Sequence, residues 1–108
     1  FFFKGFESYD EAAIKKNIRE PSAGLLTQVK QELESLANWQ AEDIHHVVQS
    51  IVDRNEVGFG KVAQPIRIAV TGSTQSPSID QTLACLGREL TLQRIAAAIT
   101  DFSARFTN

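Results

Sequence analysis

The chain has 108 residues, 43% of them hydrophobic, so it can bury one modest core but is too short for a core plus a separate large catalytic domain. Its formal charge of -2 and its isoelectric point near 5.6 exclude a surface that is basic throughout. Residues 1–53 carry five Lys or Arg and nine Asp or Glu, whereas residues 54–108 carry six and four. The second half therefore holds the positive balance.

Residues 9–19 predict a short helix. Ser8 or Asp10 can cap its N-terminus, and acidic residues occupy the first turn. Lys15 and Lys16 lie near its end, where the helix dipole favours cations. A proline at position 21 then separates this helix from the next segment.

Two longer amphipathic helices are predicted at residues 23–39 and 40–58. In each, apolar side chains recur at helical spacing and form a stripe along one face. The stripes are Leu25, Leu26, Val29, Leu33 and Leu36, and then Ile44, Val47, Val48, Ile51 and Val52. Gly58 is the predicted stop of the second helix. We expect Trp39, just before it, to pack on that helix as a staple.

The segment GKVAQPIRIAV, residues 60–70, allows two interpretations. Its second half alternates apolar β-branched side chains with others, which is typical of a strand. A lone strand would have nothing to pair with, because every other segment reads as helical, and its backbone groups would stay unsatisfied. We therefore favour a helix with Pro65 near its first turn and Gly72 at its C-terminus.

Two further helices complete the chain. The segment SPSIDQTLACLG predicts a short helix with Ser76 as its N-cap, Pro77 at the first helical position and Gly87 at its end. The last helix is predicted at residues 90–106. The sequence thus predicts an all-α fold without a sheet, a small multi-helix bundle that forms one domain over residues 1–108.

The rarer residue types limit the compartment and the chemistry. A single Cys85 excludes an internal disulfide and is expected in the core, while His45 and His46 are adjacent and cannot both face one metal ion. No apolar run approaches the roughly 20 residues that span a bilayer, and FFFKGFESYD lacks the features of a signal peptide. We expect a cytoplasmic protein without metal. The sequence begins with three Phe residues and without a Met. Because aromatic residues at an open terminus are normally covered, we expect this sequence to be a piece of a longer chain.

Residues 58–95, GFGKVAQPIRIAVTGSTQSPSIDQTLACLGRELTLQRI, resemble the C-terminal end of bacterial glutamyl-tRNA synthetase. The shared pattern runs Gly-Lys-Val-Ala-Gln-Pro, an apolar residue and Arg, then Thr-Gly, a polar loop, Ser/Thr-Pro and Leu-Gly-(Lys/Arg). A match of this length is far more specific than a short motif. The opening residues, NWQAEDIHHVVQ and EVGFGK are similar to the same family, so the resemblance covers the whole chain.

This resemblance implies the all-helical, C-terminal anticodon-binding domain of a class I aminoacyl-tRNA synthetase. The ATP-binding signatures of the family are absent, so no catalytic residue and no cofactor are expected in this segment. The parent enzyme is expected to use ATP and magnesium to join glutamate to its tRNA. The implied partners are the anticodon loop of tRNA(Glu) and the rest of the synthetase chain, with the protein acting as a monomer.

The resemblance also implies a set of tRNA-contacting residues. Arg67 matches an arginine that touches anticodon bases, and a guanidinium can both stack on a base and donate to its edge. Ser76, Pro77 and Ile79 match residues of the same base pocket, at a helix start with free N–H groups. Lys61 is expected to contact phosphate or to lie in solvent. From the residues alone, Arg67 in a surface salt bridge and Ile79 in the core remain alternatives.

Two other functions stay open on the sequence alone. A helical protein-interaction module without an RNA role would use the three N-terminal Phe residues as its docking surface, and the net acidity fits that view. Salt separates the two, because RNA binding through Lys and Arg weakens steeply as salt rises. The anticodon domain of a synthetase for another amino acid is disfavoured by the complete Gly-Lys-Val-Ala-Gln-Pro run.

Overall fold

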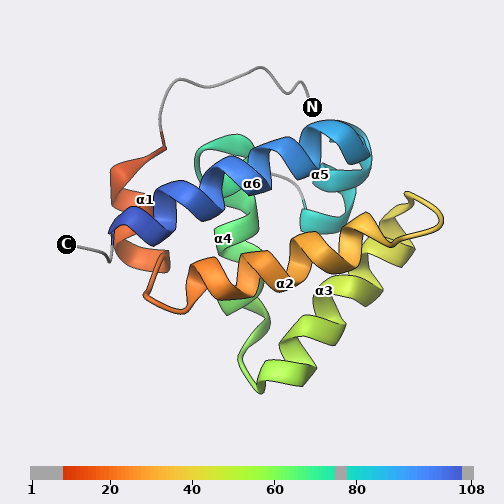
Figure 1. Cartoon of the computed structure of the whole chain (residues 1–108), viewed down its shortest axis with the longest axis horizontal. Helices are drawn as coiled ribbons and strands as arrows, with labels where there is room; N and C mark the ends of the chain where they lie inside the picture. Colours follow the sequence, from red (N-terminus) through yellow and green to blue (C-terminus); the bar gives the residue numbers. More distant parts are fainter. Residues whose placement is uncertain (1–8, 75–77, 106–108) are drawn as a thin grey trace.

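The computed structural model describes residues 9–74 and 78–105, which form six α-helices and no strand (Figure 1). In chain order the helices are α1 (Glu11–Asn17), α2 (Ser22–Glu34), α3 (Ala41–Asn55), α4 (Phe59–Thr71), α5 (Ile79–Leu86) and α6 (Arg88–Arg105). The predicted all-α fold is confirmed, and the segment that allowed a strand is the helix α4. None of the described helices is both long and apolar enough to cross a lipid bilayer.

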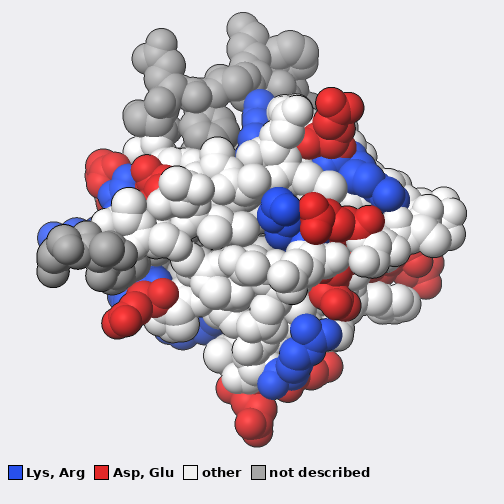
Figure 2. All heavy atoms as spheres, viewed as in Figure 1, with Lys and Arg blue, Asp and Glu red and all other residues white. Residues whose placement is uncertain are grey.

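Helix α4 lies at the centre of the bundle and packs against all five other helices. The pair α2 and α6 makes the most extensive contact, and the two helices run side by side across one face with α4 behind them (Figure 1). On that face most Lys and Arg side chains lie beside Asp or Glu side chains (Figure 2). This face therefore carries mixed charge rather than a continuous basic patch.

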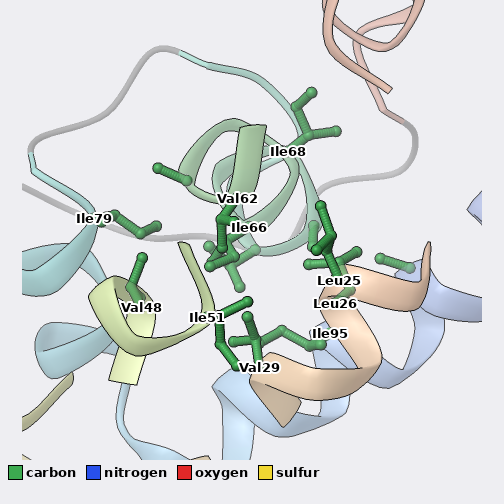
Figure 3. Close-up of a cluster of buried hydrophobic side chains, with 14 of the residues drawn as sticks. Leu25, Leu26, Val29, Val48, Ile51, Val62, Ile66, Ile68, Ile79 and Ile95 are labelled. Atoms are coloured by element: carbon green, nitrogen blue, oxygen red, sulfur yellow. The ribbon is translucent and has the colours of Figure 1, made fainter. Parts of the chain in front are cut away.

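One hydrophobic core joins the helices (Figure 3). More than half of the residues of α4 are buried, which explains its central place. The largest fully buried side chains are Phe102, Leu26, Leu33, Ile44, Ile51, Ile66, Ile68, Ile79, Leu83, Ile95, Val29 and Val48. These include most of the predicted apolar stripes, so the helical spacing in the sequence identified the core faces correctly.

Helix boundaries follow local chemistry at some ends and tertiary packing at others. At the start of α1, the Asp10 carboxylate accepts hydrogen bonds from the N–H groups of Ala12 and Ala13 at 3.0 and 3.4 Å, which confirms one of the two predicted caps. The predicted stop of α3 is wrong. That helix ends at Asn55 with Glu56 in the left-handed conformation (φ 53°), and Gly58 instead precedes α4 as its N-cap.

Helices α4 and α5 both begin at other residues than the sequence predicted. Pro65 lies well inside α4 rather than in its first turn, so the Lys61 carbonyl lacks the usual helical donor. Residues before the proline, such as Val62 and Ala63, are buried, and this burial offsets the lost hydrogen bond. Helix α5 begins with Ser78 at the N-cap, later than the predicted start.

The prediction that Cys85 lies in the core is wrong, because the residue is exposed. The buried face of α5 carries Ile79, Thr82 and Leu83, and Cys85 lies on the opposite face of this short helix. Gly87 ends α5 as predicted, with φ 87°, a conformation that favours glycine. The predicted docking residues 1–3, like Ser8 and the end of the last predicted helix, lie outside the described residues.

Candidate nucleic-acid interface

The sequence-predicted site centres on what we call the α4–α5 junction: residues 67–74 at the end of α4 and residues 78–80 at the start of α5. Arg67 is half-buried there, and its Nη1 donates a hydrogen bond to Oε1 of Gln64, one turn earlier, at 3.1 Å. Within the described ranges no carboxylate forms an ion pair with Arg67, so the salt-bridge alternative has no support there. The remaining guanidinium N–H groups are available to a base edge or a phosphate.

The backbone beneath Arg67 is held by contacts from distant parts of the chain. Nη1 of Arg94 in α6 donates to the Val70 carbonyl at 2.6 Å, and the N–H of Asp10 donates to the Gly72 carbonyl at 2.7 Å. The last carbonyls of a helix otherwise lack partners. These two bonds satisfy the carbonyls of Val70 and Gly72 and hold the end of α4, the helix from which Arg67 extends.

The start of α5 supplies a backbone surface rather than an apolar side chain. Ile79 is 1% exposed and lies beside Val48 in the core, so its side chain is not available to a base (Figure 3). Of the two interpretations that the sequence left open for Ile79, the structure supports the side chain in the core. Ser78, the N-cap of α5, is exposed, and its side chain makes no cap bond to the first turn. Ser76 and Pro77 lie outside the described residues.

An acidic contact that sequence reasoning missed joins α3 to this junction. Oδ2 of Asp80, in the first turn of α5, lies 3.1 Å from Nδ1 of His45, whose ring also packs against Phe59 with centroids 6.0 Å apart. No spacing rule connects residues 45 and 80, so only the fold reveals this pair. The Asp80 carboxylate offsets the positive end of the α5 dipole.

Lys61 is not part of this junction. It is exposed in the first turn of α4, and the six positions between it and Arg67 correspond to about 9 Å along the helix and roughly 120° around it. Lys61 instead lines a hollow of about 410 Å³ between the α1–α2 and α3–α4 turns. The structure thus divides the predicted site into two surfaces.

Several other Lys and Arg side chains form ion pairs with carboxylates. Lys30 pairs with Glu34 at 2.9 Å, Arg54 with Glu32 at 3.7 Å, and Arg105 with Glu11 at 3.1 Å. Hydrogen bonds to Glu11 and then to Asp101 raise the pKa of Arg105 further above its usual value. Across the residues that the structure describes, no three His, Cys, Asp or Glu side chains form a group suited to a metal ion.

Comparisons with known proteins identify the family of this chain. A family model described as an anticodon binding domain matches residues 1–99. The structure of a glutamate tRNA ligase from Elizabethkingia meningosepticum, in complex with its amino acid, superposes with a TM-score of 0.87 and 29% identity, covering 92% of this chain and 20% of the ligase. The structure of the glutamate-tRNA synthetase from Elizabethkingia anophelis superposes with a TM-score of 0.79 and 28% sequence identity. This match covers 90% of this chain and 18% of the synthetase.

The chain therefore spans about one fifth of the length of these enzymes. Its likeness to them extends over nearly all of its helices, and the family match covers more than half of the sequence. On this basis, the chain belongs to the anticodon binding domain family.

Proposed function

We propose that this chain recognises the anticodon loop of tRNA(Glu) as one part of a longer glutamate–tRNA ligase. The observation that carries this proposal is the position of Arg67, which extends without a carboxylate partner among the described residues from a fixed helix end, in a chain of the anticodon binding domain family. The choice of tRNA(Glu) is supported by the similarity to two glutamate ligases at 29% and 28% identity.

The chemistry of the α4–α5 junction suits unpaired bases. Loop bases are held by stacking and by hydrogen bonds to their exposed edges. Arg67 combines both, because its guanidinium is planar and carries paired donors. In this proposal Ser76 and Pro77 border the same bases, while Ile79 contributes its backbone N–H only, since its side chain is buried.

The remaining chemistry of the ligase is assigned to residues beyond this sequence. We propose that the longer enzyme acts as a cytoplasmic monomer and uses ATP and magnesium on a separate catalytic domain. The contribution of this chain is then to position the tRNA, and no step of glutamate activation involves its residues. The alternative of a protein-interaction module without an RNA role finds no support in the family match.

Binding measurements with two RNAs test the proposal. The 108-residue chain is titrated with tRNA(Glu) and with the same tRNA altered in the first two anticodon bases. We expect a dissociation constant in the micromolar range or weaker, as for a contact with few bases and phosphates, and a clear preference for the unaltered tRNA. Equal affinity for the two RNAs contradicts anticodon recognition, and affinity that does not change with salt would favour apolar docking.

A further inference from the structure

A second basic region lies away from the α4–α5 junction, where the α1–α2 turn meets the α3–α4 turn. The hollow of about 410 Å³ found there, which we call the α1–α4 hollow, is lined by both Arg19 and Lys61. Its floor includes Leu25 and Val57, and no Asp or Glu is among its lining residues. In a chain with 13 acidic residues and a net charge of -2, this is a locally positive surface.

Among the described residues, neither cation of the hollow has an acidic partner. Neither Arg19 nor Lys61 forms an ion pair with any carboxylate in the described parts of the chain. Arg19 is nevertheless held in place, because its Nη1 donates to the carbonyls of Lys15 and Ile18 at 2.9 and 3.1 Å. Its other N–H groups are left for a ligand. The hollow thus presents one anchored cation, Arg19, and one exposed cation, Lys61.

Helix electrostatics account for one of these cations but not for the other. Arg19 follows the C-terminus of α1, where the helix dipole favours positive charge. Lys61 lies in the first turn of α4, at the positive end of that helix, where a cation is disfavoured. The first turn of α4 contains no acidic residue, and its N-cap makes no side-chain hydrogen bond. The positive charge at this point is therefore uncompensated in the described fold.

We propose that the α1–α4 hollow binds a phosphate group of the RNA backbone, outside the anticodon bases, through Arg19 and Lys61. The proposal rests on the proposed function for the identity of the ligand as RNA. An anion at this point would neutralise the two cations and the positive end of α4 together. A second hollow of about 500 Å³ shares Arg19 and includes Lys15, but it also contains Glu11, which pairs with Arg105 at 3.1 Å, so the proposed phosphate site is confined to the α1–α4 hollow.

The salt dependence of binding tests this assignment. Affinities of the wild-type chain and of Lys61→Gln, Arg19→Gln and Arg19→Lys are measured over a range of salt concentrations. The two RNAs are tRNA(Glu) and a duplex hairpin without an anticodon loop. Each lost phosphate contact should reduce the slope of log affinity against log salt by about 0.9. Arg19→Lys should retain most of the slope, because it keeps the charge.

The matched control is Lys30→Gln, which removes the same charge from a lysine that already pairs with Glu34 at 2.9 Å. Circular dichroism of each variant checks that it is folded. A slope that falls for Lys61→Gln with both RNAs, and by more than for Lys30→Gln, supports the hollow. Equal slopes for these two variants, or no binding of either RNA, overturn it. Loss of anticodon preference alone contradicts the proposed function and leaves the phosphate site standing.

Discussion

The two ends of α4 differ in how firmly the fold holds them. At the C-terminal end, Arg94 and Asp10 donate to the carbonyls of Val70 and Gly72, and the guanidinium of Arg67 is oriented by Gln64. At the N-terminal end, the N-cap is Gly58, which has no side chain to cap the helix, and the exposed Lys61 lines the α1–α4 hollow. One helix thus carries a hydrogen-bonded arginine towards one end and an exposed lysine at the other.

This difference matches two ways of contacting RNA. Reading a base edge needs donors in a defined geometry, because the sequence information lies in the pattern of hydrogen bonds. Holding a phosphate needs mainly charge, which a flexible ammonium supplies. The C-terminal end of α4, with Arg67, is therefore suited to reading a base. The N-terminal end, with Lys61, is suited to binding a phosphate.

The largest effect is expected from a change that loosens both ends together. Ile66 is fully buried in α4, next to Arg67 in sequence. Ile66→Ala should cost about 2–5 kcal/mol of unfolding free energy, from lost burial and the cavity left behind. Urea denaturation measures this change, with Lys61→Ala as the exposed control at under about 0.5 kcal/mol. Similar midpoints for the two variants would show that α4 is not the centre of the core.

A smaller loss of unfolding free energy should follow from a change that frees only the C-terminal end of α4. Arg94→Met removes the donor to the Val70 carbonyl and should cost about 1.5–3 kcal/mol, as for a hydrogen bond to a charged group. Anticodon preference should fall too, since Arg67 then extends from a less fixed helix end. Native-state hydrogen exchange locates the effect. Faster exchange confined to the N-terminal half of α4 would contradict this role of Arg94.

The next effect concerns binding rather than folding. In the longer ligase that we propose, Arg67→Ala should cost roughly 1–3 kcal/mol in recognition of the cognate anticodon, and should change unfolding free energy by under about 0.5 kcal/mol. Arg67→Lys should restore only part of the loss, because an ammonium keeps the charge but not the planar fork. Aminoacylation kinetics with cognate and anticodon-altered tRNA decide the point. If both substrates weaken equally, Arg67 holds phosphate and does not read bases.

The smallest effect is a pH dependence near the C-terminal end of α4. Burial raises the pKa of Tyr9 above its ordinary value of 10.0, Asp101 raises it further and Arg105 lowers it. The folded state then holds this proton more tightly than the unfolded state. The contribution of the protonated Tyr9 hydroxyl to folding stability is complete below about pH 10 and is lost as pH rises through the folded-state pKa.

Tyr9→Phe isolates this contribution, because Phe keeps the ring near Phe102, whose centroid lies 5.4 Å away, but has no hydroxyl to ionise. The difference in urea midpoint between wild type and variant should shift in favour of the variant above pH 10. A difference that stays constant from neutral to alkaline pH would rule out the raised pKa.

The sequence predicted the helices well because their signal is local. Periodic apolar residues mark a buried face wherever the helix ends, which is why most members of the predicted apolar stripes are buried, whereas Cys85, predicted in the core without such a stripe, is exposed. Boundaries depended on packing instead. Helix α4 begins at Phe59, before the start that Pro65 predicted, because Val62 and Ala63 are buried. At the end of α3, Glu56 rather than a glycine adopts the left-handed conformation. Neither outcome has a signature in the local residues.

The candidate site was predictable only in part, for a similar reason. Family resemblance pointed to Arg67, but its partner Gln64 and the bond from Arg94 depend on helical geometry and on the packing of α6. The pairing of Arg19 with Lys61 at one hollow requires two turns to meet, and nothing in their spacing of 42 residues indicates it. Long-range contacts of this kind follow from the fold rather than from motifs.

The single tryptophan gives the molecule an internal optical reporter. The Trp39 indole N–H donates to the carbonyl of Leu83 in α5 at 2.9 Å, and the Arg88 guanidinium lies 5.5 Å from the ring centroid. Indole fluorescence responds to loss of such a hydrogen bond and to a nearby cation. Any RNA that shifts α5 on docking at the α4–α5 junction would therefore change the emission without an attached dye, and rapid mixing could time that movement.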